Sequence, residues 1–261
     1  MPSTQSAIVR WVEVSTPSAY HESLMIYLGH CRHVRVAEFL GEGDVSMIPR
    51  FTSVRMHTDK IPKPMRRCTT EAWIIKLTKS TVTFEGLVFL EPETDGEPRT
   101  LLSSSITTIV TVSTQPMRAV PIPTGLGIVV EKQPSKWAVE SFAIPAMPTV
   151  VPADSFEYRF HVRDSDADRF GHVTNAKYVI FFSDALMAGA RAGRFAHRSG
   201  DVKWFEIMFE KEVKPLQEVV VVCWFEERQE AYIFLLKGED GIVDSKGRMF
   251  VGDVDRRKAQ L

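Results

Sequence analysis

The chain repeats itself at a fixed offset, and this duplication restricts its possible folds more than any other feature. Shifted by 151 positions without a gap, the sequence aligns identical residues along a stretch of about fifty positions. The pairs are His21 with His172, Tyr27 with Tyr178, Ala37 with Ala188, Lys63-Pro64 with Lys214-Pro215, and Trp73 with Trp224. Because insertions would make unrelated segments drift apart, a constant offset predicts two copies of one structural unit.

Each copy has the pattern of one helix and a set of largely antiparallel strands, which predicts an α+β fold. Long apolar stretches predict the helices, at 24–40 and 176–192. Strand-like runs lie at 7–15, 52–60, 71–90 and 100–112 in the first copy, and at 156–164, 204–213, 218–227, 231–237 and 248–254 in the second. Hairpin turns are indicated at 95–96, 238–241 and 245–247.

Proline is concentrated between the two copies. Seven of the 15 prolines lie between positions 116 and 152. Because proline lacks a backbone donor and restricts φ, this segment resists joining a sheet. We therefore expect a first unit over 1–115, a semi-rigid connector over 116–154 and a second unit over 155–261.

Composition argues against several classes of protein. With 32 Lys and Arg against 33 Asp and Glu, the chain has no net field that attracts nucleic acid or an anionic membrane. Its 16 Phe and 5 Trp argue against disorder. The longest apolar run, 219–224, is too short for a membrane span, and the three widely spaced cysteines fit neither a disulfide scaffold nor a zinc ribbon. No signal peptide is visible, so we expect a cytoplasmic protein.

The segment 162–178 (VRDSDADRFGHVTNAKY) is the candidate for chemistry. A strand leads three acidic residues into a tight turn, a histidine follows, and a buried helix begins near Thr174. The three acids are Asp164, Asp166 and Asp168, the turn is closed by Gly171, and the histidine is His172. A third acid at a buried helix start is electrostatically costly unless it is used, which makes Asp168 the candidate catalytic residue. Asp164 and Asp166 fit turn and cap chemistry.

The pattern V-R-x-S-D-x-D-x-F-G-H-V-x-N-A-x-Y runs without a gap over seventeen positions. It resembles the signature turn of hotdog-fold acyl thioesterases, which include 4-hydroxybenzoyl-CoA thioesterase and the acyl-ACP thioesterases. The resemblance implies a double hotdog, in which each unit has a central helix wrapped by a curved antiparallel sheet. It also implies cleavage of an acyl-CoA or acyl-carrier-protein thioester in the crevice between the units, without a metal or other cofactor.

The resemblance also implies roles for matching residues. Asp168 would be the nucleophile or the base acting on water, and His172 would position or activate that water. Asn175 belongs to the catalytic set as the second residue of a usual Asn-Asn pair, whose first residue is replaced here by Thr174. Backbone amides at the helix start would form the oxyanion hole. From the sequence itself, we expect the apolar helix face with Tyr178, Phe181 and Phe182 to border the acyl pocket. The substrate-binding residues are therefore Gly171, Val173, Thr174 and Tyr178.

The family's acyl-ACP branch also uses an acid on a following strand, and it has Asn where Phe170 stands here. Glu206, Glu210 and Glu212 alternate along the predicted strand, and we favour Glu206 as this acid. In the first copy, the position equivalent to Asp168 is Pro17. We therefore expect one working site per chain.

Several alternatives stay open. The same fold hosts dehydratases, hydratases and other acyl-tailoring enzymes of fatty acid or polyketide metabolism, and a non-catalytic acyl-binding protein is also compatible with the sequence. The carrier, CoA or protein, is open, as is the choice between a monomeric pseudo-dimer and a homo-oligomer. His30, Cys31 and His33 lack a third strong ligand at helical spacing, so we expect no metal site there.

Overall fold

The computed structural model describes residues 3–7, 45–58, 68–94, 96–114, 117–122, 144–167 and 171–251. These residues divide into two compact units, of which the first ends at Ile144 and the second begins at Pro145. The helix predicted over 24–40 lies outside the described residues, as do His21 and Tyr27.

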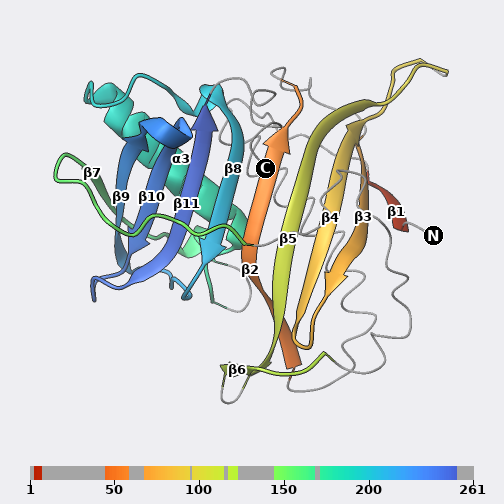
Figure 1. Ribbon diagram of the computed structural model, residues 1–261, viewed down its shortest axis with the longest axis horizontal. Helices are drawn as coiled ribbons and strands as arrows, with labels where there is room; N and C mark the ends of the chain where they lie inside the picture. Colours follow the sequence, from red (N-terminus) through yellow and green to blue (C-terminus); the bar gives the residue numbers. More distant parts are fainter. Residues whose placement is uncertain are drawn as a thin grey trace. The chain divides into compact units, whose positions relative to one another are not determined.

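The first unit is an antiparallel sheet with the strand order β1-β3-β4-β5-β2, and β6 pairs with β5 (Figure 1). Its strands are β1 (Ser3–Ala7), β2 (Val45–Met56), β3 (Cys68–Leu77), β4 (Thr81–Leu90), β5 (Thr100–Thr114) and β6 (Met117–Ala119). Val82, Phe84 and Ile109 form a buried cluster in this sheet.

Two sequence expectations are corrected in this unit. The single run predicted over 71–90 is two strands, because the chain reverses after Leu77, where the amide of Thr81 donates to Oγ1 of Thr78 at 3.0 Å. The proline-rich connector was expected to stay out of the sheet, yet its residues Met117–Ala119 pair with the end of β5. This strand is short, and Pro116 and Pro121 flank it.

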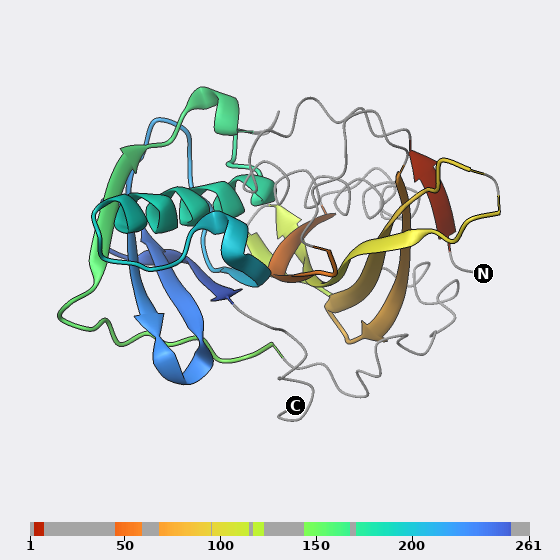
Figure 2. The ribbon, with the colours of Figure 1, turned by 90° about the horizontal axis from the view of Figure 1, so that it is seen from above.

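The second unit is an antiparallel sheet with the order β8-β11-β10-β9-β7 and one long helix, α3, which lies along one face (Figure 2). Its elements are β7 (Phe156–His161), α3 (Asn175–Arg191), β8 (Val202–Phe209), β9 (Glu218–Glu226), β10 (Ala231–Lys237) and β11 (Val243–Val251). The two sheets have the same strand order when β7, β9, β10, β11 and β8 are matched with β1, β3, β4, β5 and β2. In this matching, Trp73 in β3 is equivalent to Trp224 in β9. No helix among the described residues is long and apolar enough to span a bilayer.

Aromatic side chains hold α3 against this sheet. Phe182 of α3 stacks on Phe234 of β10 with ring centroids 5.1 Å apart. The same ring lies so close to β11 that a Cβ at Gly247 would come within 2.5 Å of it. The turn predicted at 245–247 is therefore wrong, because this glycine belongs to a strand and admits a ring from the helix. The turn predicted at 238–241 is confirmed, and Gly241 has a φ of +72° there.

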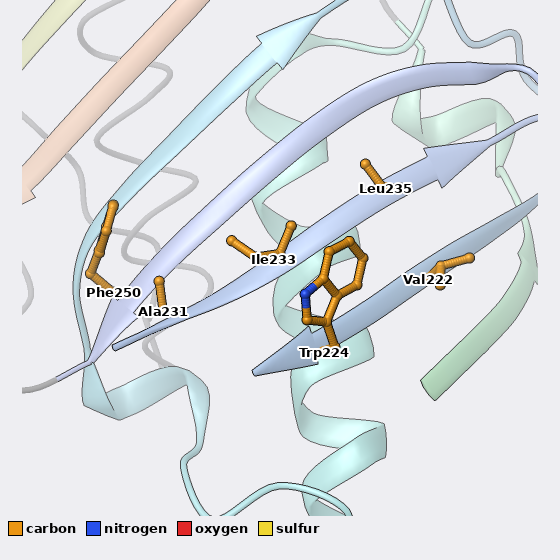
Figure 3. Close-up of a cluster of buried hydrophobic side chains, with 6 residues drawn as sticks. All are labelled: Val222, Trp224, Ala231, Ile233, Leu235 and Phe250. Atoms are coloured by element: carbon orange, nitrogen blue, oxygen red, sulfur yellow. The ribbon is translucent and has the colours of Figure 1, made fainter. Parts of the chain in front are cut away.

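The other face of the sheet carries its own apolar cluster (Figure 3). Its buried members are Val222, Trp224, Ala231, Ile233, Leu235 and Phe250. Both faces of β10 are thus buried, which explains why its sequence AYIFLLK is apolar at successive positions and does not alternate.

Candidate active site

The strand-to-helix turn of the second unit is built as the sequence predicts. β7 ends at His161, a short 3₁₀ turn covers Asp164–Asp166, and α3 begins at Asn175 with Thr174 as its N-cap. Gly171 has a φ of +77°, in the left-handed region that glycine adopts most readily. Residues 168–170, and with them Asp168, lie outside the described residues.

Asp166 stabilises this turn through its side chain and its carbonyl. Its buried carboxylate accepts a hydrogen bond from the amide of Arg163 at 3.0 Å and lies 3.7 Å from the ammonium of Lys177 on the first turn of α3. Its carbonyl accepts the amide of Thr174 at 3.0 Å. Asp166 therefore links the beginning of the turn to the helix start, as expected of a structural acid.

His172 is paired with Glu212. The imidazole Nε2 lies 3.2 Å from a carboxylate oxygen of Glu212, and the two side chains are 40% and 35% exposed. A neutral imidazole that donates its Nε2–H to the carboxylate keeps its lone pair on Nδ1, so the carboxylate fixes the ring's orientation and tautomer. Such a ring can accept a proton from water and return it to a leaving group.

The position of Glu212 differs from the sequence expectation. β8 ends at Phe209, so Glu212 lies in the irregular segment that follows and not on the strand. One residue later, the carbonyl of Val213 accepts the amide of Val173 at 3.1 Å. This hydrogen bond holds the segment against the helix start and brings Glu212 to His172.

Glu206, the acid favoured from the sequence, is not brought to the helix start. Phe209 of β8 packs against Tyr178 of α3 at 5.1 Å, so by strand alternation Glu206 points to the opposite face. There its buried carboxylate is held by Arg248, whose Nε donates at 2.8 Å and whose Nη2 is also in contact. Glu206 lies on the strand as predicted, and its side chain lies on the face of the sheet opposite α3.

Tyr178 belongs to the packing between α3 and β8. Its side chain is only 3% exposed and contacts the rings of Phe181 and Phe209. Burial raises the pKa of the phenol well above its usual value, and a hydrogen bond with the backbone of Val213 partly opposes this rise. The structure thus places Tyr178 in the core, where its ring packs between the start of α3 and β8.

Only some of the amides at the helix start are available to a ligand. Those of Val173 and Thr174, expected in the oxyanion hole, already donate to Val213 and Asp166. Within the described part of the chain, no hydrogen bond is made by the amides of Gly171, Asn175 or Ala176. Unpaired amides at a helix N-terminus favour an anion, by direct donation and through the helix dipole.

Residues 151–246 match the family model described as the acyl-ACP thioesterase C-terminal domain. This segment is similar to the C-terminal domain of acyl-ACP thioesterases. The match confirms the resemblance to hotdog acyl thioesterases, and it confirms thioester hydrolase as the enzyme class.

Three solved structures of thioesterases share the fold of both units of this chain. A 12:0-ACP thioesterase from Umbellularia californica is 17% identical with a TM-score of 0.73, covering 95% of this chain and 96% of its own. An acyl-ACP thioesterase from Bacteroides thetaiotaomicron is 13% identical with a TM-score of 0.71, covering 96% and 98%. A protein described as an oleoyl thioesterase from Lactobacillus plantarum is 16% identical with a TM-score of 0.70, covering 97% and 98%. No curated protein sequence matches the chain.

The candidate metal ligands His30, Cys31 and His33 lie outside the described residues. Among the residues that the structure does describe, no three His, Cys, Asp or Glu side chains are arranged to hold a metal ion.

Proposed function

We propose that this chain is a double hotdog that hydrolyses an acyl thioester of CoA or of an acyl carrier protein, at one site where α3 begins. The shared strand order of the two units supports the duplicated fold. The thioesterase structures support it too, because each aligns with at least 95% of this chain. The division into units at 1–115 and 155–261 with a connector over 116–154 is part of the proposal, as are a cytoplasmic location and a place in fatty acid or polyketide metabolism.

The observation that carries the proposed chemistry is the pairing of His172 with Glu212 beside amides at the helix start that make no hydrogen bond to any described residue. A thioester carbonyl needs an oriented attacker and a stabilised oxyanion, since its thiolate leaves readily. The amides of Gly171, Asn175 and Ala176 suit the oxyanion. The side chain of Asn175, on the first residue of the helix, would orient water or substrate.

In the proposed reaction, Asp168 either attacks the carbonyl carbon itself or removes a proton from the attacking water. The new C–O bond places negative charge on the carbonyl oxygen. If Asp168 acts as the base, collapse of this intermediate breaks the C–S bond, and the proton taken from water passes through His172 to the departing thiolate. If Asp168 attacks, collapse releases the thiolate and leaves an acyl anhydride on Asp168; water then hydrolyses this anhydride, and His172 transfers the proton of that water to the thiolate. Glu212 stabilises His172 while that ring carries the extra proton.

The test is release of free thiol from a panel of saturated, enoyl and hydroxyacyl thioesters, each presented on CoA and on a carrier protein. Thiol release that is lost in both Asp168→Asn and Glu212→Gln supports the proposal. Consumption of an enoyl or hydroxyacyl chain without thiol release would indicate a dehydratase or hydratase. Tight binding without turnover would indicate an acyl-binding protein.

A further inference from the structure

The hydroxyl of Tyr178 is a buried polar group behind the residues of the proposed reaction. The sequence predicts this tyrosine at the border of an acyl pocket, yet its side chain is only 3% exposed and its ring packs against Phe209 at 5.1 Å. A buried hydroxyl costs free energy unless it makes a hydrogen bond, and phenylalanine would fill the same space without that cost. A tyrosine at this position therefore indicates a polar partner for the hydroxyl.

That partner is the backbone of Val213. Burial raises the pKa of the Tyr178 phenol, the charges of Asp244 and Glu212 add to the rise, and a hydrogen bond with this backbone opposes it. A hydrogen bond that lowers the pKa of a phenol favours the anion, so the amide of Val213 is the donor and the phenol oxygen is the acceptor. The carbonyl of Val213 accepts the amide of Val173 at 3.1 Å. Both polar groups of this backbone are thus bound by residues at the start of α3.

Val213 directly follows Glu212, and its backbone determines where that acid lies. The segment 210–217, between β8 and β9, is irregular, so no strand ladder fixes the position of Glu212. Its side chain is 35% exposed, and among the described residues its carboxylate pairs with His172 alone, at 3.2 Å. A side chain with so little support of its own takes its position from the adjacent backbone, one Cα–Cα step of about 3.8 Å away.

We propose that Tyr178 is a positioning residue, whose hydroxyl fixes the Val213 backbone and thereby keeps the carboxylate of Glu212 in place, an inference that rests on the proposed function. The carboxylate then holds the imidazole of His172 in the tautomer that keeps its lone pair on Nδ1. Tyr178 acts through these groups and not on the substrate itself. Without the hydroxyl, a buried amide loses its acceptor, and the segment that carries Glu212 moves to satisfy it.

The variant Tyr178→Phe removes the hydroxyl and keeps the ring between α3 and β8. We expect its kcat to fall about ten-fold with KM within about two-fold of the parent, because proton transfer is affected and substrate contacts are not. In a Glu212→Gln background the same change should have no further effect on kcat, since the carboxylate through which Tyr178 acts is already gone. Equal losses of kcat in both backgrounds would overturn the proposal.

Tyr232 is the matched control, because it makes the same kind of bond near the other end of α3. Its side chain is 1% exposed, and its hydroxyl accepts the amide of His197, which follows the helix, at 3.4 Å. Tyr232→Phe and Tyr178→Phe should each lower the melting temperature by roughly 2–4 °C. Only Tyr178→Phe should change kcat. Equal rate losses from the two variants would assign the effect to stability and overturn the positioning role.

The ring of His172 provides a readout that does not depend on turnover. The ¹⁵N chemical shifts of its two ring nitrogens, recorded where the ring is neutral, distinguish the Nε2–H tautomer from the Nδ1–H tautomer. The parent and Tyr232→Phe should show the Nε2–H tautomer, and Tyr178→Phe should show a mixture.

A parental signal in Tyr178→Phe overturns the positioning proposal. A parent that has the Nε2–H tautomer, loses it in Tyr178→Phe and yet releases no thiol from any substrate overturns the proposed hydrolysis and leaves the structural link from Tyr178 to His172 in place.

Discussion

Oε2 of Glu212 lies 3.2 Å from Nε2 of His172, and it reaches this position from the segment after β8. Glu212→Gln keeps the shape of the side chain but removes the charge that stabilises a protonated imidazole. We expect kcat to fall by roughly 10²-fold with KM nearly unchanged, because proton transfer is affected and substrate contacts are not. Steady-state thiol release on one acyl-CoA measures both constants.

Two other glutamates serve as controls for this prediction. Glu210 lies two residues earlier and pairs with Lys246 at 3.4 Å, so Glu210→Gln should leave kcat within about two-fold of the parent. Glu206→Gln should lower stability through the buried pair with Arg248, yet leave the rate per folded molecule intact. A large rate loss from Glu206→Gln, with Glu212→Gln active, would return the catalytic role to the acid on the strand.

The contrast between these acids shows where sequence reasoning succeeds. β10 was predicted at its observed bounds, and α3 to within a residue at each end, because each depends on a local apolar pattern. Glu212 was placed on the strand because alternation was continued past Phe209, where the strand ends. Gly247 was read as a turn because the ring that requires it, Phe182, is distant in the sequence. Contacts of this kind depend on tertiary packing, which a local pattern does not contain.

Asp168 and Asp166 should respond differently to the same change. Asp168→Asn removes the proposed attacker or base, and we expect kcat to fall by roughly 10²–10⁴-fold with little change in melting temperature. Asp166→Asn removes the charge that accepts the amide of Arg163 and attracts Lys177, and should cost about 1–2 kcal/mol of unfolding free energy. Thermal denaturation and thiol release, measured on both variants, separate the two roles. An Asp168→Asn variant with near parental turnover on every accepted substrate would refute the mechanism.

The two copies of the repeat should contribute unequally to catalysis. The position equivalent to Asp168 in the first copy is Pro17, and Asn175 is replaced there by Leu24, although His21 matches His172. We expect His172→Ala to reduce kcat strongly and His21→Ala to leave most of the turnover. Equal losses from the two variants would show that both copies take part.

Asp244, at the start of β11, should make stability depend on pH. Its side chain is 1% exposed, and the ammonium of Lys211 is 3.9 Å away. Burial raises the pKa of this carboxyl above 3.8, while the charge of Lys211 partly opposes the rise and that of Asp240 adds to it. The folded state therefore holds the proton more tightly than the unfolded state.

For such a group, the stabilising contribution is complete below the unfolded pKa and is lost as pH rises through the folded pKa. Asp244→Asn removes this loss, so its melting temperature should exceed that of the parent at pH 7, and the difference should vanish below about pH 3.8. Asp240→Asn is the control with the opposite sign, because the hydrogen bond from Lys211 lowers the pKa of Asp240, and its contribution is present at neutral pH and lost in acid. Thermal denaturation of the three proteins between pH 3 and pH 8 checks both signs. A melting temperature of Asp244→Asn below that of the parent at pH 7 would mean that the attraction to Lys211 outweighs the cost of burying the charge.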